Sequence, residues 1–270
     1  MSRTARWLAL GLALLGGGCA TVPKDPEARA VFIETNDPLE PLNRKVFSFN
    51  QVLDSVLIKP VAQGYVRAVP RPARDSIRNF MSNLNEPLVF GNNVLQGQFR
   101  RAGTTAGRFV LNSTLGLAGL IDFAALHGLR KQTGDFGQTL YSWGAPGGPY
   151  LVLPVLGPSN PRDTVGLGTD AYLNPYRYAV ENNDFPTLVA YGPAILGGID
   201  ERSRSIDKLD AIQKEAIDYY ASLRSLFRQN REAQLRGGEE APTPGEGTFY
   251  EDPGVATPEK PPPGAGQPSR

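Results

Sequence analysis

Apolar residues recur every three to four positions along most of the chain, the spacing of one face of an α-helix. The first such stripe comprises Leu42, Val46, Phe49, Leu53, Val56 and Leu57. Asp37 is predicted to cap this helix, with Pro38 at its first position and Glu40 reaching back as a capping-box acid. Lys59-Pro60 is predicted to end it, because a proline disfavours the helical conformation of the residue before it.

The same spacing predicts further helices over residues 72–84, 89–95, 98–115, 163–173, 186–199 and 206–235. The first two are separated by Asn85-Glu86-Pro87, since an internal proline removes a helical hydrogen bond. Tyr150 to Leu153 predicts a short strand, and the prolines on either side exclude it from the centre of a sheet. The pattern therefore predicts an all-α single domain with irregular connections.

The stretch from Leu115 to Leu126 differs, because it is apolar nearly all round and contains two glycines and one acid, Asp122. A helix of this kind is either buried in the core or lies against lipid. Twelve residues are too few to cross a bilayer.

The N-terminus has the order of a secretory signal peptide. Arg3 and Arg6 precede an uncharged apolar run, and three glycines then lead to Cys19, the one cysteine of the chain. Small residues before a cysteine resemble a bacterial lipobox, although Gly16 stands where leucine is usual. We expect cleavage before Cys19 and its acylation, and two or three acyl chains would hold the protein firmly to a bilayer. Ordinary cleavage with an incidental cysteine is the alternative. Ala20 rather than aspartate after the cysteine favours the outer membrane.

Composition sets the predicted boundaries of the chain. From Gly237 onward, 34 residues contain eight prolines and seven glycines, which predicts a disordered tail. The expected organisation is a signal peptide (1–18), a lipidated linker (19–34), a helical domain (35–236) and the tail (237–270). Without Arg3 and Arg6, the 28 basic residues fall to 26 against 27 acidic ones, so the net charge is −1. This balance gives no electrostatic footprint for nucleic acid.

Catalytic signals are few. His127 is the one histidine and sits beside Gly128, where capping a helix end is the simpler interpretation. We expect no cofactor and no metal, although oxygen ligands from Asp163, Asp170 and Glu181 remain conceivable. Paired carboxylates would suffice for glycoside hydrolysis. The candidates for that chemistry are Glu86, Asp122, Asp135, Asp163 and Asp170, and each also fits a capping role.

Several blocks in consistent order carry a family resemblance that covers roughly 200 residues from Asn36 to the end of the last predicted helix. They include Asn36-Asp37-Pro38-Leu39-Glu40, Asn43-Arg44, Glu86-Pro87, Asn112-Ser113-Thr114-Leu115-Gly116, Gly119-Leu120-Ile121-Asp122, Phe136-Gly137-Gln138-Thr139-Leu140 and Gly148-Pro149-Tyr150-Leu151-Val152-Leu153-Pro154. The chain resembles the MlaA (VacJ) lipoproteins of the maintenance-of-lipid-asymmetry pathway.

The resemblance implies a ring-shaped helical lipoprotein on the periplasmic face of the outer membrane, beside a trimeric porin. Its channel would remove phospholipids from the outer leaflet and pass them to a soluble periplasmic carrier, without covalent chemistry. The segment from Leu115 to Phe136 resembles a hairpin that flanks the channel in this family. We expect it to gate the channel, or else to be a buried core hairpin. The residues concerned are Gly116, Gly119, Asp122, Gly128 and Gly134.

The motif residues Asp37, Pro38, Glu40, Asn43 and Arg44 are expected to be structural rather than to contact lipid. Two other functions stay open from the sequence. One is a porin-associated structural lipoprotein without lipid flux, and the other is a periplasmic carboxylate-dependent hydrolase.

The anchor generates a first prediction. Cys19→Ala removes the sulfur that would carry the diacylglyceryl group, so the variant should move from the membrane pellet to the soluble fraction after cell lysis. Immunoblotting of the two fractions measures this, with Ser2→Ala as a control that leaves the cleavage region intact. Retention of the Cys19→Ala protein in the pellet would contradict the predicted anchor.

Overall fold

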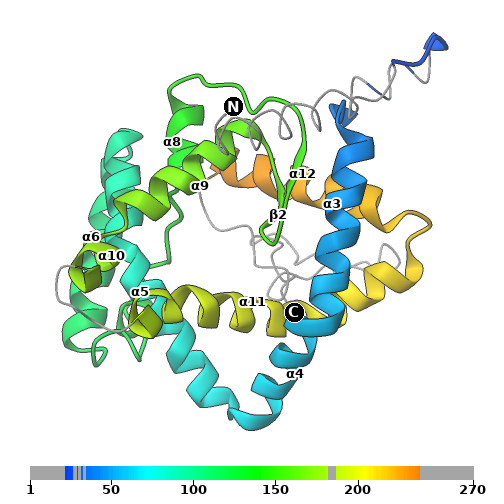
Figure 1. Cartoon of the computed structure of the whole chain (residues 1–270). Helices are drawn as coiled ribbons and strands as arrows, with labels where there is room; N and C mark the ends of the chain where they lie inside the picture. The colour runs from blue at the N-terminus through cyan, green and yellow to red at the C-terminus, as the bar shows by residue number, and fades with distance from the viewer. Residues whose placement is uncertain (1–21, 27–28, 30–31, 33–34, 182–186, 238–270) are drawn as a thin grey trace, which may run out of the picture.

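A computed structural model describes residues 22–26, 29, 32, 35–181 and 187–237 of the protein. These residues are mostly helical, and Figure 1 shows the helices following one another around a ring. The predicted all-α, ring-shaped fold is confirmed. Cys19, the signal peptide and the tail beyond Gly237 lie outside the described residues.

The elements follow in chain order. They are α3 (Glu40–Leu53), the π-helical turn η1 (Asp54–Ile58), α4 (Lys59–Ala68), α5 (Arg71–Leu95), α6 (Phe99–Thr114), α7 (Phe123–Leu126), α8 (Phe136–Ser142), β1 (Leu151–Leu153), β2 (Gly157–Ser159), α9 (Pro161–Leu173), α10 (Pro175–Glu181), α11 (Thr187–Glu215) and α12 (Tyr219–Gly237). Within the described part of the chain, no helix combines the length and apolar character needed to cross a membrane.

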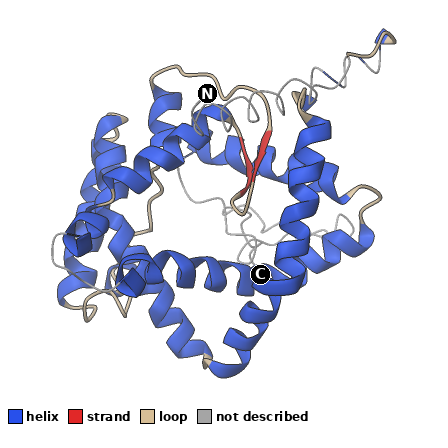
Figure 2. Cartoon of the chain, in the orientation of Figure 1, coloured by secondary structure: helices blue, strands red, loops and turns tan. Residues whose placement is uncertain are grey.

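The predicted strand is confirmed as β1. It pairs with β2 in an antiparallel hairpin, in which Leu151 lies opposite Ser159 and Leu153 opposite Gly157. Figure 2 shows the two strands within the ring of helices rather than on its outer circuit.

The beginning of α3 differs from the prediction. The helix starts at Glu40 with Leu39 at the N-cap, and no side chain caps it. Asp37 is therefore not the cap. Its buried carboxylate instead accepts hydrogen bonds from Asn43 (2.8 Å), from the Tyr220 hydroxyl and from Arg224 (2.7 Å). These partners hold the carboxylate away from the helix end, which no side chain caps.

The two predicted proline breaks are also wrong. At Pro60 the chain continues from α3 through η1 into α4, where the Lys59 N–H donates to the Asp54 carbonyl five residues earlier. This wider turn accommodates a proline that has no N–H to donate. Two hydrogen bonds from Arg202 on α11 to the Asp54 carboxylate, 2.7 and 2.8 Å long, secure the turn.

At Pro87 the helix α5 runs on without interruption. Its neighbour Glu86 is buried against Arg108 of α6, and Asn83 bonds Ser113 of the same helix at 2.9 Å. These contacts hold the helical turn before the proline against α6. Tertiary packing therefore outweighs the lost backbone hydrogen bond.

The apolar stretch from Leu115 is not a helix until α7. Leu117, Ala118 and Gly119 have φ angles of 52°, 58° and 94°, which a right-handed helix does not contain. The stretch is a series of tight turns followed by one helical turn.

The final predicted helix is two helices. α11 and α12 meet at residues 216–218, where Asp218 accepts the Ala221 N–H at 3.2 Å and caps α12. Arg44 of α3 holds the same carboxylate, so a contact from elsewhere in the fold fixes the turn. The predicted helix over 163–173 is confirmed as α9, with Asn160 rather than Asp163 as its N-cap.

The interior is polar. Among the described residues, the largest fully buried side chains are Arg108, Asn43, Asn93, Thr105, Thr139 and Asp37. Buried polar groups need hydrogen-bond partners. The ring is therefore held together by directed polar contacts more than by a large apolar core.

Arg231 of α12 makes the clearest of these contacts. Its guanidinium bonds Asp135, the cap of α8, at 2.7 and 2.8 Å, and Asp163 of α9 at 2.8 and 2.9 Å. Burial by itself raises the pKa of Asp163, but Arg231 and Arg162 outweigh burial and hold that pKa below its ordinary value. One cation thus joins α12 to α9 and to the start of α8.

This junction generates a second prediction. Arg231→Met should lower the free energy of unfolding by about 1–3 kcal/mol at pH 7, because it removes the cation that Asp135 and Asp163 share and leaves Asp163 with Arg162 alone. A depressed pKa contributes stability above the unfolded pKa, which is 3.8 for an ordinary aspartate, and the contribution is lost as the pH falls through the folded value. The deficit of the variant should therefore shrink below about pH 4.

Urea unfolding followed by circular dichroism at both pH values measures this deficit. Arg236→Met is the matched control, because Arg236 is on the same helix and is exposed with a local partner, Glu232. Equal losses in the two variants would contradict the proposed role of Arg231.

Candidate functional site

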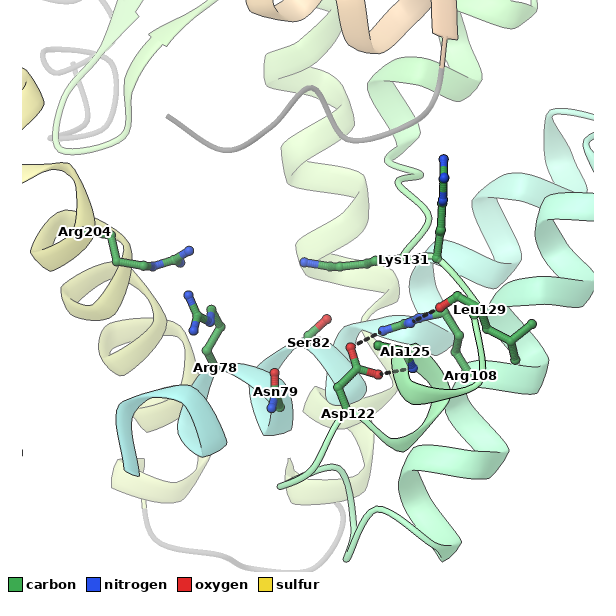
Figure 3. A pocket seen from close by; sticks show the side chains of 11 residues that line it. Arg78, Asn79, Ser82, Arg108, Asp122, Ala125, Leu129, Lys131 and Arg204 are labelled. Atoms are coloured by element: carbon green, nitrogen blue, oxygen red, sulfur yellow. Dashed lines mark hydrogen bonds and ion pairs between the residues drawn. The ribbon is translucent and has the colours of Figure 1, made fainter. Parts of the chain in front are cut away.

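A cavity of about 520 Å³ opens between α5, α11 and the segment around α7. Its lining consists of Arg78, Asn79, Ser82, Arg108, Asp122, Ala125, Gly128, Leu129, Arg130, Lys131 and Arg204. Five of these side chains are cationic and one is acidic. Figure 3 shows Arg78 and Arg204 extending into the space from one side and Lys131 from the other.

Arg108 forms the back of this cavity. It is buried, and it donates to Glu86 at 3.1 Å, to Asp122 at 2.9 Å and to the Leu129 carbonyl at 2.5 Å. Burial raises the pKa of Glu86 despite the neighbouring guanidinium. For Asp122, burial acts in the same direction, but the bonds from Arg108 and Asn112 outweigh it and lower the pKa. The charge of Arg108 is thus committed to its neighbours.

Asp122 connects the cavity to α7. Its carboxylate accepts the Ala125 N–H at 3.1 Å as the N-cap of α7, and it accepts Asn112 of α6 at 3.1 Å. Asn112 also accepts the Ala124 N–H at 2.8 Å. These bonds fasten the short helix to α6.

The glycines of the predicted hairpin stand at positions that a larger residue would not fit, and the cause differs from one position to the next. A Cβ on Gly116 would lie 2.3 Å from the Ile121 carbonyl oxygen, and one on Gly119 would lie 2.5 Å from the Asn83 Cβ. A Cβ on Gly134 would lie 3.0 Å from the Val89 carbonyl oxygen, whereas Gly128 has open space but a φ of 77°. Close packing accounts for three of the four, and gating by this hairpin stays a prediction.

The apolar side chains of the hairpin are exposed. The exposed fractions are 57% for Leu115, 63% for Leu117, 43% for Leu120 and 45% for Ile121. Burial in the core, the alternative for this segment, does not describe these side chains.

The motif residues near the start of α3 lie at a junction away from the cavity. Asn43 donates to Asp37 at 2.8 Å and to the Tyr150 carbonyl at 3.0 Å, and it accepts the Val152 N–H at 3.0 Å. Arg44 bonds Glu40 and Asp218, and its pKa is raised mainly by the hydrogen bonds that it donates to Asp218. Pro38 lies in the turn before α3. Together these residues join α3 to β1 and α12.

The remaining acidic candidates are held by arginines or by backbone and amide donors. Asp135 and Asp163 share Arg231, and Glu86 and Asp122 share Arg108. Asp170 accepts the Phe136 N–H at 2.9 Å and Asn92 at 3.0 Å, and burial raises its pKa. Within the described ranges, no three His, Cys, Asp or Glu side chains gather as metal ligands would.

His127 is the C-cap of α7, as its position before Gly128 predicted. Its Nδ1 lies 3.0 Å from the Phe123 carbonyl oxygen, and its ring packs against the Phe123 ring at 4.5 Å between centroids.

Sequence reasoning missed the basic lining. Arg78, Arg130 and Arg204 are more than fifty residues apart along the chain, so no motif connects them. The adjacent pair Arg130-Lys131, inside the predicted hairpin, was the one local signal. The ring brings these residues together.

The packing of the hairpin generates a third prediction. Gly119→Ala and Gly97→Ala both place a Cβ at positive φ, 94° and 72°, but nothing lies within 4 Å of the second Cβ. The conformational strain is shared, so the difference between the variants isolates the clash with Asn83. Gly119→Ala should be less stable than Gly97→Ala by about 1–3 kcal/mol, the usual range for overpacking. Thermal unfolding compares them, and indistinguishable stabilities would show that the hairpin yields freely.

Comparison with known proteins agrees with this architecture. The family model described as MlaA lipoprotein matches residues 35–234. The chain is 35% identical to the Escherichia coli K12 protein named intermembrane phospholipid transport system lipoprotein MlaA, over 87% of this chain and 90% of that one. An uncharacterized protein of Rickettsia felis is 37% identical over 76% of this chain and 80% of its own length.

A solved structure, described as the structural basis for maintenance of bacterial outer membrane lipid asymmetry, superimposes with a TM-score of 0.64 at 34% identity. The match covers 74% of this chain and 98% of that one. Sequence and fold therefore agree over the whole helical ring. The chain belongs to the MlaA lipoprotein family.

Proposed function

We propose that this protein carries phospholipids out of the outer leaflet of the outer membrane towards the periplasm, with the interior of the helical ring as their path. The named relatives are components of an intermembrane phospholipid transport system, and the similar solved structure concerns outer-membrane lipid asymmetry. In this role the protein moves the phospholipid and changes none of its covalent bonds.

The observation that carries the proposal is the distribution of polarity. Large apolar side chains are widely exposed, including Val56 at 73%, Phe99 at 71% and Leu126 at 74%, while many buried positions hold polar or charged residues. Exposed apolar surface on this scale is typical of contact with a membrane. The polar and cationic side chains that line the cavity, among them Arg78, Asn79 and Lys131, would lower the cost of moving a charged head group past hydrocarbon.

Cys19 supplies the anchor in this proposal. Acyl chains at the start of the mature chain would keep the ring at the periplasmic face of the outer membrane, since two or more chains give stable attachment. A trimeric porin beside the ring and a soluble periplasmic lipid carrier are the proposed partners, and both come from the family resemblance. The hairpin around Gly116 and Gly119 is the proposed gate.

Neither alternative accounts for the geometry as well. A carboxylate hydrolase needs a free acid–base pair, whereas the candidate carboxylates are held by Arg108, Arg231 and backbone donors. We therefore propose a non-enzymatic role. A purely structural lipoprotein gives no reason for a basic cavity between three elements of the ring.

A fourth prediction tests the function. Deletion of the gene should raise the amount of phospholipid in the outer leaflet and increase sensitivity to detergent, because misplaced lipid is no longer removed. Surface labelling with a membrane-impermeant amine reagent measures the lipid, and expression of the intact chain from a plasmid should restore the normal level.

Complementation with Cys19→Ala is the control for the anchor and should fail at equal protein abundance. A deletion strain with unchanged surface phospholipid would argue against transport and in favour of the structural alternative.

A further inference from the structure

The lining of the basic cavity described above has a charge imbalance. Arg108 is neutralised by Glu86 and Asp122, and it serves the packing of α6. The other cations that line the cavity are Arg78, Arg130, Lys131 and Arg204, and the lining contains no acid apart from Asp122. The cavity wall therefore carries an excess of positive charge.

The local partners of two of these cations lie outside the lining. Arg78 contacts Asp75 three residues earlier on α5, and Arg204 contacts Glu201 at 2.6 Å and Asp200 at 3.2 Å on α11. The side chains of Asp75 and Glu201 are 45% and 52% exposed. Exposed pairs of this kind contribute little to folding. An anion in the cavity can therefore share the guanidinium group of Arg78 and the end of Arg204 that meets Glu201, while the buried Asp200 keeps its contact with Arg204.

The Nε of Arg204 is buried 3.2 Å from an oxygen of Asp200, in a contact that is not well directed enough to be a hydrogen bond. Asn79 and Ser82 add uncharged polar groups to the same lining. Planar guanidinium groups with nearby amide and hydroxyl groups match the oxygens of a phosphate.

The cavity also adjoins apolar surface. Asn79 donates to the Leu120 carbonyl at 3.4 Å, and Asp122 follows the exposed Ile121 directly. An amphiphile with its phosphate among the arginines would thus have apolar side chains beside its acyl chains. A free phosphate has no apolar part, so it would make no contact with that surface.

We propose that this cavity is a head-group site that binds the phosphate of an anionic phospholipid and disfavours zwitterionic ones. The inference rests on the proposed transport function and adds a head-group preference to it. Phosphatidylglycerol offers only negative charge to the arginines, whereas the ammonium of phosphatidylcholine would be repelled by the same side chains.

Lipid binding to the full-length mature protein in detergent micelles tests the site. The probes are fluorescent phosphatidylglycerol and phosphatidylcholine with identical acyl chains, measured by fluorescence anisotropy at fixed ionic strength. We expect the unaltered protein to bind the anionic probe about tenfold more tightly, the effect of one good charge-assisted hydrogen bond. Arg78→Gln/Arg204→Gln should abolish that preference and leave the zwitterionic affinity within about twofold.

The matched control is Arg67→Gln/Arg100→Gln, which removes two exposed arginines elsewhere and changes the net charge equally. It should keep the preference. Loss of preference in the control as well, or its persistence in the cavity variant, would overturn the site. Circular dichroism checks folding, and Arg78→Gln/Lys131→Gln replaces the first variant if Asp200 does not tolerate the loss of Arg204.

Competition separates the two sources of phosphate. Glycerophosphoglycerol should displace the anionic probe, and inorganic phosphate at the same concentration should displace it far less. Equal displacement by inorganic phosphate would identify a free-anion site and overturn the head-group assignment.

Transfer of both lipids between vesicles by the unaltered protein is measured separately. Transfer without any head-group preference would leave the proposed function standing and reject this inference, whereas no transfer of either lipid would count against the function itself.

Discussion

Buried ion pairs between arginine and aspartate or glutamate hold the ring in shape. A ring of helices cannot gather its side chains into one large apolar core, because each helix meets only its neighbours. Arg231 fastens α12 to α8 and α9, and Arg108 fastens α6 to α5 and to the turn before α7. Removing one partner of such a pair leaves an uncompensated buried charge. Both partners of each pair must therefore stay in contact, and this requirement fixes the positions of the helices.

Because buried ion pairs rather than a large apolar core hold the ring together, many apolar side chains remain on its surface. Positions that would fill the core of an ordinary soluble domain, such as Val56 and Phe99, are exposed, while Arg108 and Asp37 are buried. In water alone this distribution is unfavourable, because exposed apolar area carries a free-energy cost. Beside lipid the cost disappears. The polarity of the fold and the proposed membrane location thus have one physical explanation.

The cavity and the hairpin share their supports. Asp122 caps α7, accepts a hydrogen bond from Asn112 and neutralises Arg108. One carboxylate therefore positions both the basic wall of the cavity and the end of the apolar turns. Gly119 lets the turns pack against Asn83 of α5, the helix that also presents Arg78. A movement of the hairpin would therefore alter the cavity, which couples the proposed gate to the proposed head-group site.

The helical period was enough to predict an all-α fold, because that signal is local and needs no knowledge of contacts. The ordered family blocks indicated the family and, through the resemblance, the ring, whereas the anchor at Cys19 stays a prediction. Local rules failed at Asp37, Pro60 and Pro87, where partners on other helices compensate for a missing cap or a missing N–H. They failed again at Asp218, where Arg44 holds the turn between α11 and α12. The basic cavity was decided by the tertiary structure alone, since Arg78 and Arg204 become neighbours only when the ring closes.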